Sequence, residues 1–118
     1  VDSNNYPHIA YFDGSNGSLK YAKWNGSSWQ ITTVYTASSG GGVAFTSIAL
    51  DSLGYPHIAA WASPVNKLVY AKWDGATWTT ELISEITSLF PAIAVDSADM
   101  PHLVGIGGGE LRHMTWQP

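Results

Sequence analysis

The sequence repeats itself at intervals of 45 to 49 residues, and this recurrence constrains the fold more than any other feature. The segment DSNNYPHIA at 2–10 returns as DSLGYPHIA at 51–59 and as DSADMPHLV at 96–104. A fixed period of this length indicates one supersecondary unit copied along the chain.

A second segment follows the first in every copy. LKYAKWNGSSW at 19–29 returns as LVYAKWDGATW at 68–78, and a shorter copy, LRHMTW, lies at 111–116. Both long copies contain Asn-Gly or Asp-Gly between alternating apolar residues, which predicts a tight β-hairpin. The abundance of Gly, Ser and Thr and the absence of helical periodicity agree with an all-β chain.

The middle copy divides into four strand-length pieces separated by turn residues, as the blade of a β-propeller requires. The predicted strands are, in order, 45–51, 56–62, 67–73 and 77–83. By alignment, residues 1–42 form a blade that lacks its first strand, 43–88 form a complete blade, and 89–118 form a blade that lacks its last strand. About two and a half blades leave a ring open, so we expect it to be completed by further chain or by homo-oligomerisation.

Charge and composition exclude several classes of partner. The net charge is −4 with only five Lys and Arg residues, which leaves too little positive charge to bind nucleic acid. No apolar run approaches the roughly 20 residues that span a bilayer, so we expect no membrane insertion. The sequence has no cysteine, which excludes a disulfide framework and cysteine-based metal sites.

The hairpin motif resembles the Asp-box, or sialidase-type, repeat of propellers from secreted microbial proteins. The Gly-x-x-Trp part of that motif matches residues 26–29 and 75–78, whereas the acid or amide, Asn25 or Asp74, stands one position later than in the family. The resemblance implies a β-propeller at the cell surface or outside the cell.

Residues that recur once per copy are interpreted as structural. We expect the aspartates to cap turns, the histidines to hydrogen-bond a nearby backbone or aspartate group, and the tryptophans to pack between blades. Equivalent histidines in successive blades lie too far apart to share a metal ion, so neither a metal nor a cofactor is predicted. The recurring residues are Asp2, His8, Trp29, Asp51, His57, Trp78, Asp96 and His102.

No catalytic residue is predicted, and the chain is interpreted as a non-enzyme. A sialidase-like site requires an arginine cluster for the substrate carboxylate, and Arg112 is the only arginine in the chain. No pair of nucleophile and general base is evident.

Recognition is expected instead in the loops that differ between copies, at the end of the blades opposite the repeated motifs. Trp61, which ends a strand beside such a loop, is expected to be partly exposed. The predicted ligand-binding residues are Asp13, Asn16, Tyr35, Trp61, Asn66 and Glu85.

Three functions follow from these features. The favoured one is an extracellular or cell-surface carbohydrate-binding module that is lectin-like, because small polar loops with a few aromatic rings suit a glycan. The first alternative is a self-assembling surface or filament component, because the incomplete blades require a partner. The second is a fragment of a sialidase-like glycoside hydrolase.

Overall fold

The computed structural model describes residues 1–38, 40–63, 65–87 and 90–116, and these residues form strands and turns with no helix. The ten strands are β1 (His8–Asp13), β2 (Ser18–Trp24), β3 (Trp29–Thr36), β4 (Gly42–Leu50), β5 (Pro56–Ser63), β6 (Lys67–Trp73), β7 (Trp78–Ile83), β8 (Ala92–Val95), β9 (Pro101–Gly107) and β10 (Glu110–Thr115). No membrane-spanning helix exists among the described residues.

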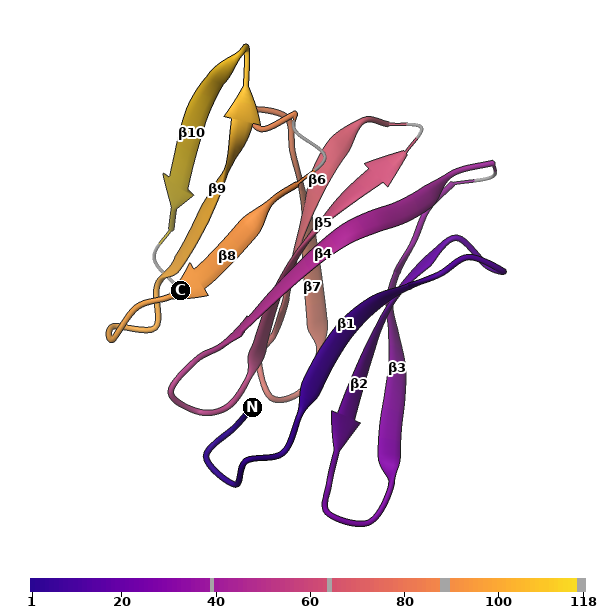
Figure 1. Cartoon of the computed structure of the whole chain (residues 1–118), viewed down its shortest axis with the longest axis vertical. Coiled ribbons are helices and arrows are strands. Elements are labelled where there is room, and N and C mark those ends of the chain that lie inside the picture. The colour runs from indigo at the N-terminus through magenta and orange to yellow at the C-terminus, as the bar shows by residue number, and fades with distance from the viewer. Residues whose placement is uncertain (39, 64, 88–89, 117–118) are drawn as a thin grey trace.

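The strands form three antiparallel sheets that follow one another along the chain (Figure 1). The N-terminal sheet has the order β1-β2-β3, the middle sheet β4-β5-β6-β7, and the C-terminal sheet β8-β9-β10. Each strand pairs with its neighbour in sequence, so every sheet is a simple meander. The all-β prediction is confirmed, and the division of the chain into propeller blades stays a prediction.

The strands of the middle sheet lie close to their predicted positions. The third strand has the predicted bounds, and the second and fourth differ by one residue at one end. The first strand, β4, begins three residues before the predicted position 45. Its pairing with β5 shifts register at a bulge between Ala44 and Ser47 and continues on both sides of that bulge. Phe45, at this bulge, has a φ of 52°.

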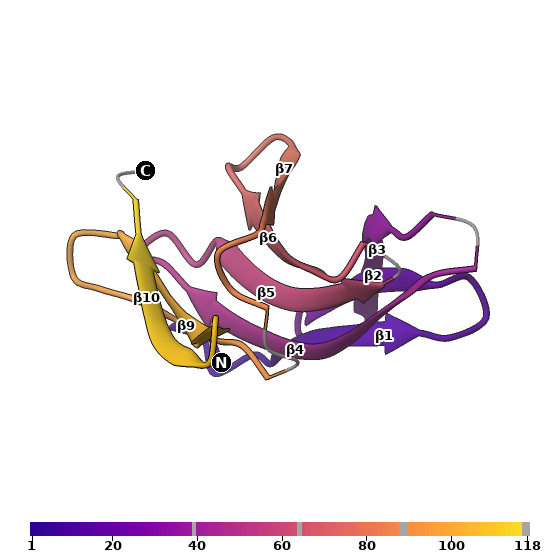
Figure 2. The same ribbon diagram turned by 90° about the horizontal axis from the view of Figure 1, so that it is seen from above.

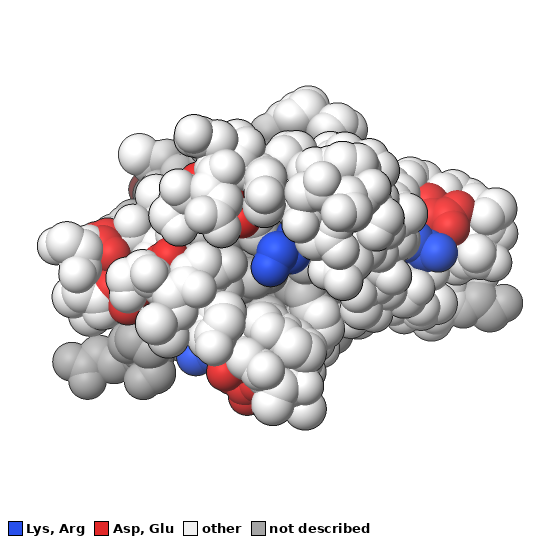
Figure 3. Space-filling view, turned by 90° about the horizontal axis from the view of Figure 1, so that it is seen from below, with Lys and Arg blue, Asp and Glu red and all other residues white. Residues whose placement is uncertain are grey.

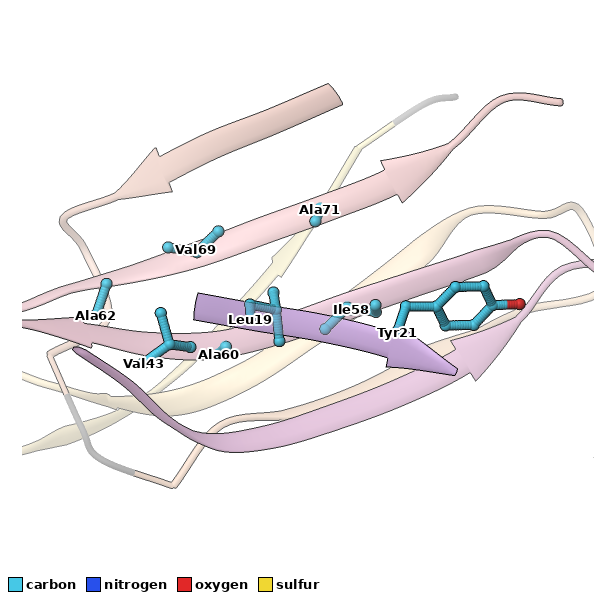
Figure 4. Packing of buried hydrophobic residues seen from close by; sticks show 8 residues of the cluster. All are labelled: Leu19, Tyr21, Val43, Ile58, Ala60, Ala62, Val69 and Ala71. Atoms are coloured by element: carbon cyan, nitrogen blue, oxygen red, sulfur yellow. The ribbon is translucent and has the colours of Figure 1, made fainter. Parts of the chain in front are cut away.

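Two apolar clusters hold the three sheets together. In the first, Leu19 and Tyr21 of β2 pack against the middle sheet, at Val43, Ile58 and other buried residues (Figure 4). In the second, side chains from the opposite face of the middle sheet pack against the C-terminal sheet; its members include Leu68, Tyr70, Ile83, Ile93 and Leu103. Each sheet thus has a forward face, turned toward the next sheet in sequence, and a backward face, turned toward the preceding one.

Strand β4 is also tied to both neighbouring sheets by hydrogen bonds. The Thr46 hydroxyl donates to the carbonyl of Ala10 in β1 at 2.9 Å, and the backbone N–H of Ile93 in β8 donates to the Ser47 hydroxyl at 3.2 Å. Figure 2 shows β4 running beside β1 in the same layer. These contacts fix the three sheets side by side and so position the spaces between them.

Charged side chains are sparse on the surface. On the face shown in Figure 3, the lysine and arginine side chains lie apart from one another, some of them beside acidic side chains, and form no continuous positive patch. This arrangement agrees with the low positive charge of the sequence.

Candidate functional site: two pockets between the sheets

An aspartate, a histidine and a tyrosine are linked by hydrogen bonds in the first two copies of the repeat. In the middle sheet, His57 lies 2.7 Å from the Tyr70 hydroxyl through Nδ1 and 3.2 Å from the Asp51 carboxylate through Nε2. The same carboxylate accepts the backbone N–H groups of Leu53 and Tyr55, which closes the β4–β5 turn. These hydrogen bonds agree with the expectation that the repeated aspartates cap turns and that each histidine bonds a nearby backbone or aspartate group.

The equivalent groups in the other sheets keep this arrangement with one substitution. His8 bonds Asp2 and the Tyr21 hydroxyl in the N-terminal sheet. In the C-terminal sheet His102 bonds Asp96, but its second partner is His113, at 2.9 Å, in place of tyrosine.

The electrostatics of these groups assign the protons. The hydrogen bond from His8 lowers the pKa of Asp2 to about 2, while burial, aided by the nearby Asp2 charge, raises the pKa of Tyr21 to about 12. At neutral pH the carboxylate is therefore an acceptor and the hydroxyl keeps its proton. Both hydrogen bonds of His8 are formed when its Nε2–H donates to the Asp2 carboxylate and its Nδ1 accepts from the Tyr21 hydroxyl. The hydroxyls of Tyr21 and Tyr70 are thus hydrogen-bonded within the fold, and the two side chains also line pockets between the sheets.

The first pocket lies between the N-terminal and middle sheets and has a volume of about 310 Å³. This volume is at the lower end of the range typical for small-molecule sites. One wall comes from β2 and β3, and the other from the β4–β5 turn and the β6–β7 hairpin. The lining residues are Tyr21, Lys23, Gln30, Thr32, Leu53, Gly54, Tyr55, Pro56, Trp73 and Trp78.

Aromatic rings and hydrogen-bonding groups face each other across this pocket. Trp78 packs edge-on against Tyr21, with ring centroids 5.4 Å apart, and Trp73 lies 5.7 Å from Trp78. The opposite wall presents the exposed side chains of Gln30 and Thr32. An apolar ring surface beside a planar amide and a hydroxyl can hold a ligand that has both C–H faces and hydroxyl groups.

The second pocket repeats the first between the middle and C-terminal sheets, with a volume of about 200 Å³. Tyr70, Lys72 and Pro101 stand at the positions that Tyr21, Lys23 and Pro56 occupy in the first pocket. Glu81 replaces Thr32, and its carboxylate accepts a hydrogen bond from the Trp116 indole N–H at 3.3 Å. Trp116 also stacks on Tyr70, with centroids 4.7 Å apart, so its ring occupies space at this pocket.

The hairpin beside each pocket is shaped by glycine. Gly75 has a φ of +99°, and a Cβ at this position would lie 2.7 Å from the Tyr55 hydroxyl oxygen. Gly26 has the same relation to Tyr6. Only glycine therefore lets the tyrosine of the first turn pack against the hairpin, and this contact builds one wall of the first pocket.

The six predicted ligand-binding residues lie elsewhere, and none of them lines either pocket. Asp13 organises the β1–β2 turn: its carboxylate accepts from Ser15 and from the Asn16 amide and pairs with Lys20 at 3.3 Å. The hydrogen bonds from Ser15 are the main reason that its pKa falls to about 2. Asp13 and Asn16 thus bond to each other.

Three of the other predicted residues also lie away from both pockets. Tyr35 is half-buried and packs against the first apolar cluster. Asn66 occupies a turn with a φ of 52°, and Glu85 is exposed in the β7–β8 loop. A ligand-binding role for these residues stays a prediction.

The expected exposure of Trp61 is wrong. Its side chain is only 9% exposed, because β5 lies between β4 and β6 and the neighbouring sheets cover both of its faces. Trp61 belongs to the core of the middle sheet.

Sequence reasoning missed the two pockets because it assigned the repeated end of each unit to structure alone. The available signal was the recurrence of Tyr21 and Lys23 as Tyr70 and Lys72, two strand positions that the repeat keeps and the turns do not require. No cluster of three or more potential metal ligands occurs among the described residues.

Comparison with known proteins identifies a shared fold. No family model and no curated protein matches the chain. Among solved structures, the chain is similar to a fucose lectin from Kordia zhangzhouensis in complex with methyl-fucoside, with a TM-score of 0.63 at 22% sequence identity. The match covers 98% of this chain and 88% of the lectin chain, so the likeness in fold extends over nearly the whole length of both.

Proposed function

We propose that this chain is a non-catalytic carbohydrate-binding module and that its pockets between the sheets bind sugar. The observation that carries the proposal is the first pocket, in which Trp73 and Trp78 face Gln30 and Thr32 across about 310 Å³. A pyranose presents an apolar C–H face, which packs on an indole ring, and hydroxyl groups, which bond to amide and hydroxyl side chains. A monosaccharide unit is of a suitable size for such a cavity.

The likeness in fold supports this choice among the candidate functions, because the similar structure is a lectin with a bound fucoside. We also propose that the module acts outside the cell or at its surface. An enzyme fragment is disfavoured by the chemistry of the first pocket, whose titratable side chains are Tyr21, Tyr55 and Lys23. The Tyr21 hydroxyl is already hydrogen-bonded to His8, and the described lining holds no carboxylate or histidine.

The proposal is tested by isothermal titration with methyl-fucoside and by a glycan array. A matched pair of variants locates the site. Thr32 and Thr33 are adjacent exposed residues of β3, but only Thr32 lines the first pocket. We expect Thr32→Ala to weaken binding and Thr33→Ala to leave it unchanged, because side chains alternate between the two faces of a strand.

Loss of a single hydrogen bond to a sugar hydroxyl corresponds to a weakening of roughly 2-fold to 10-fold, from a net value of about 0.5–1.5 kcal/mol. Both variants change exposed positions and should fold as the parent does. Absence of binding to every glycan tested, or equal effects of the two substitutions, would contradict the proposal.

A further inference from the structure

Equivalent apolar residues of the repeat are buried in some copies and exposed in others, and the pattern locates two incomplete faces. Leu19 and Leu68 lie on the forward faces of the N-terminal and middle sheets, and both are fully buried. Leu111, the equivalent residue of the C-terminal sheet, is 74% exposed. The forward face of the C-terminal sheet therefore lacks the cover that the same face has in the other two sheets.

The backward faces show the converse pattern. Ile58 and Leu103 are fully buried on the backward faces of the middle and C-terminal sheets. Ile9, the equivalent residue of the N-terminal sheet, is 43% exposed. One open face thus lies at each end of the row of three sheets (Figure 1).

A further surface hollow lies on the N-terminal sheet, and its lining corresponds to one wall of the first pocket. Its lining residues are Asn5, Tyr6, Pro7, Trp24 and Trp29. These five stand at the positions of Gly54, Tyr55, Pro56, Trp73 and Trp78, which form one wall of the first pocket. The opposite wall, which β2 and β3 provide in the first pocket, is absent here, and Trp29 is 45% exposed as a result.

The β2 residues of the missing wall have equivalents on the other open face, whereas no described strand of the C-terminal sheet corresponds to β3. His113 and Thr115 of β10 stand at the positions of Tyr21 and Lys23. They lie on the C-terminal sheet together with Leu111 and are exposed. One wall of a pocket and the β2 part of its opposite wall are therefore present in this chain, at opposite ends of it.

We propose that a second copy of this chain docks its C-terminal sheet against the N-terminal sheet of the first, and that the two copies together form a further pocket between Trp24 and Trp29 of one copy and His113 and Thr115 of the other. Leu111 of one copy packs near Ile9 of the other, as Leu19 packs near Ile58 within the chain. His113 then faces Trp29 across the shared pocket, as Tyr21 faces Trp78.

We assign the partner of each open face to a second copy because the equivalents of these two faces already pack against each other within the chain. Each is the repeat of a face that packs against its counterpart inside this chain, so docking reuses a contact that the sequence makes twice. The contact joins two different faces and is therefore heterologous, and successive copies join head to tail until a ring closes. The assignment of sugar to the shared pocket rests on the proposed function, whereas the docking itself does not.

The first experiment measures association of the unmodified chain and of two variants by sedimentation velocity at micromolar concentration. The wild type is expected to associate. Leu111→Asp places a charge on one open face and is expected to give a monomer. Val65→Asp changes an exposed residue in the β5–β6 turn, away from both open faces, and is expected to associate as the wild type does.

A mixing experiment tests the head-to-tail geometry. Ile9→Asp blocks the other open face and is also expected to be monomeric. Mixed with Leu111→Asp, it should form a one-to-one dimer, because each variant keeps the face that the other has lost. A monomeric wild type, association of either variant with itself, or failure of the two to pair would overturn the docking proposal.

Titration with methyl-fucoside then separates the two proposals. Associated wild type is expected to bind one more sugar per chain than monomeric Leu111→Asp. Equal stoichiometry would refute the shared pocket while the pockets within the chain remain functional. An associating chain that binds no sugar would instead refute the proposed function and leave the docking proposal in place.

Discussion

Removal of the Tyr70 hydroxyl should destabilise the protein, because that hydroxyl satisfies a buried histidine. Tyr70 is 7% exposed, and His57, whose Nδ1 lies 2.7 Å from the hydroxyl oxygen, is 2% exposed. In Tyr70→Phe the ring keeps its packing, but Nδ1 loses its partner in a place that water does not reach. A buried polar group left without a hydrogen bond costs about 1–3 kcal/mol.

The matched control is Tyr35→Phe, the same chemical change at a half-buried tyrosine whose hydroxyl makes no hydrogen bond to the described residues. Its free energy of unfolding should change by less than about 0.5 kcal/mol. Urea denaturation followed by tryptophan fluorescence measures both. For a chain of this length, the expected loss in Tyr70→Phe corresponds to a fall in Tm of roughly 3–6 °C per kcal/mol.

The reasoning is refuted if Tyr70→Phe is as stable as the wild type, or if the two substitutions have equal effects. A Tyr70→Phe variant with unchanged free energy of unfolding would mean that His57 finds another hydrogen-bond partner or that the bond to the hydroxyl makes no net contribution to stability. Unchanged slopes of the denaturation curves would confirm that the comparison reports on the folded state.

Two further predictions concern the turns. Gly75→Ala should lower the free energy of unfolding, measured by urea denaturation, more than Gly54→Ala does. Both glycines have a positive φ, which costs alanine about 1–2 kcal/mol, but only at Gly75 would the new Cβ also collide with Tyr55. Equal losses of stability in the two variants would contradict this reasoning. Asp2 has a pKa lowered from 3.8 to about 2, so its contribution to stability is complete above pH 3.8 and is lost as pH falls through about 2. The difference in denaturation midpoint between wild type and Asp2→Asn should therefore shrink across that interval, and a difference that is constant with pH would show that the carboxylate charge plays no part.

The fold was largely predictable from the sequence because the repeat shows each local signal more than once. The Asp-Gly and Asn-Gly dipeptides mark the hairpins, and prolines 56 and 101 mark strand starts, as the structure confirms. The bulge in β4 was not predicted; its residues Thr46 and Ser47 hydrogen-bond to the neighbouring sheets. Such contacts join residues far apart in sequence and leave no local pattern.

The candidate site was not predicted, because a residue that repeats for structural reasons can also line a pocket. Trp78 was assigned to packing, and it does pack against Tyr21, but the same ring forms a pocket wall. Trp61 shows the opposite error: the end of a strand beside a variable loop suggested exposure, yet the neighbouring sheets bury it. Exposure in such a fold depends on how sheets face one another, which periodicity within one copy does not encode.

The most direct test of the proposed site is a crystal structure of the chain with methyl-fucoside. The account predicts sugar density in the first pocket, with a C–H face against Trp73 or Trp78 and hydroxyl groups within hydrogen-bonding distance of Gln30 and Thr32. Density at the variable loops around Asp13 and Asn66, or empty pockets at a sugar concentration that saturates binding in solution, would contradict it.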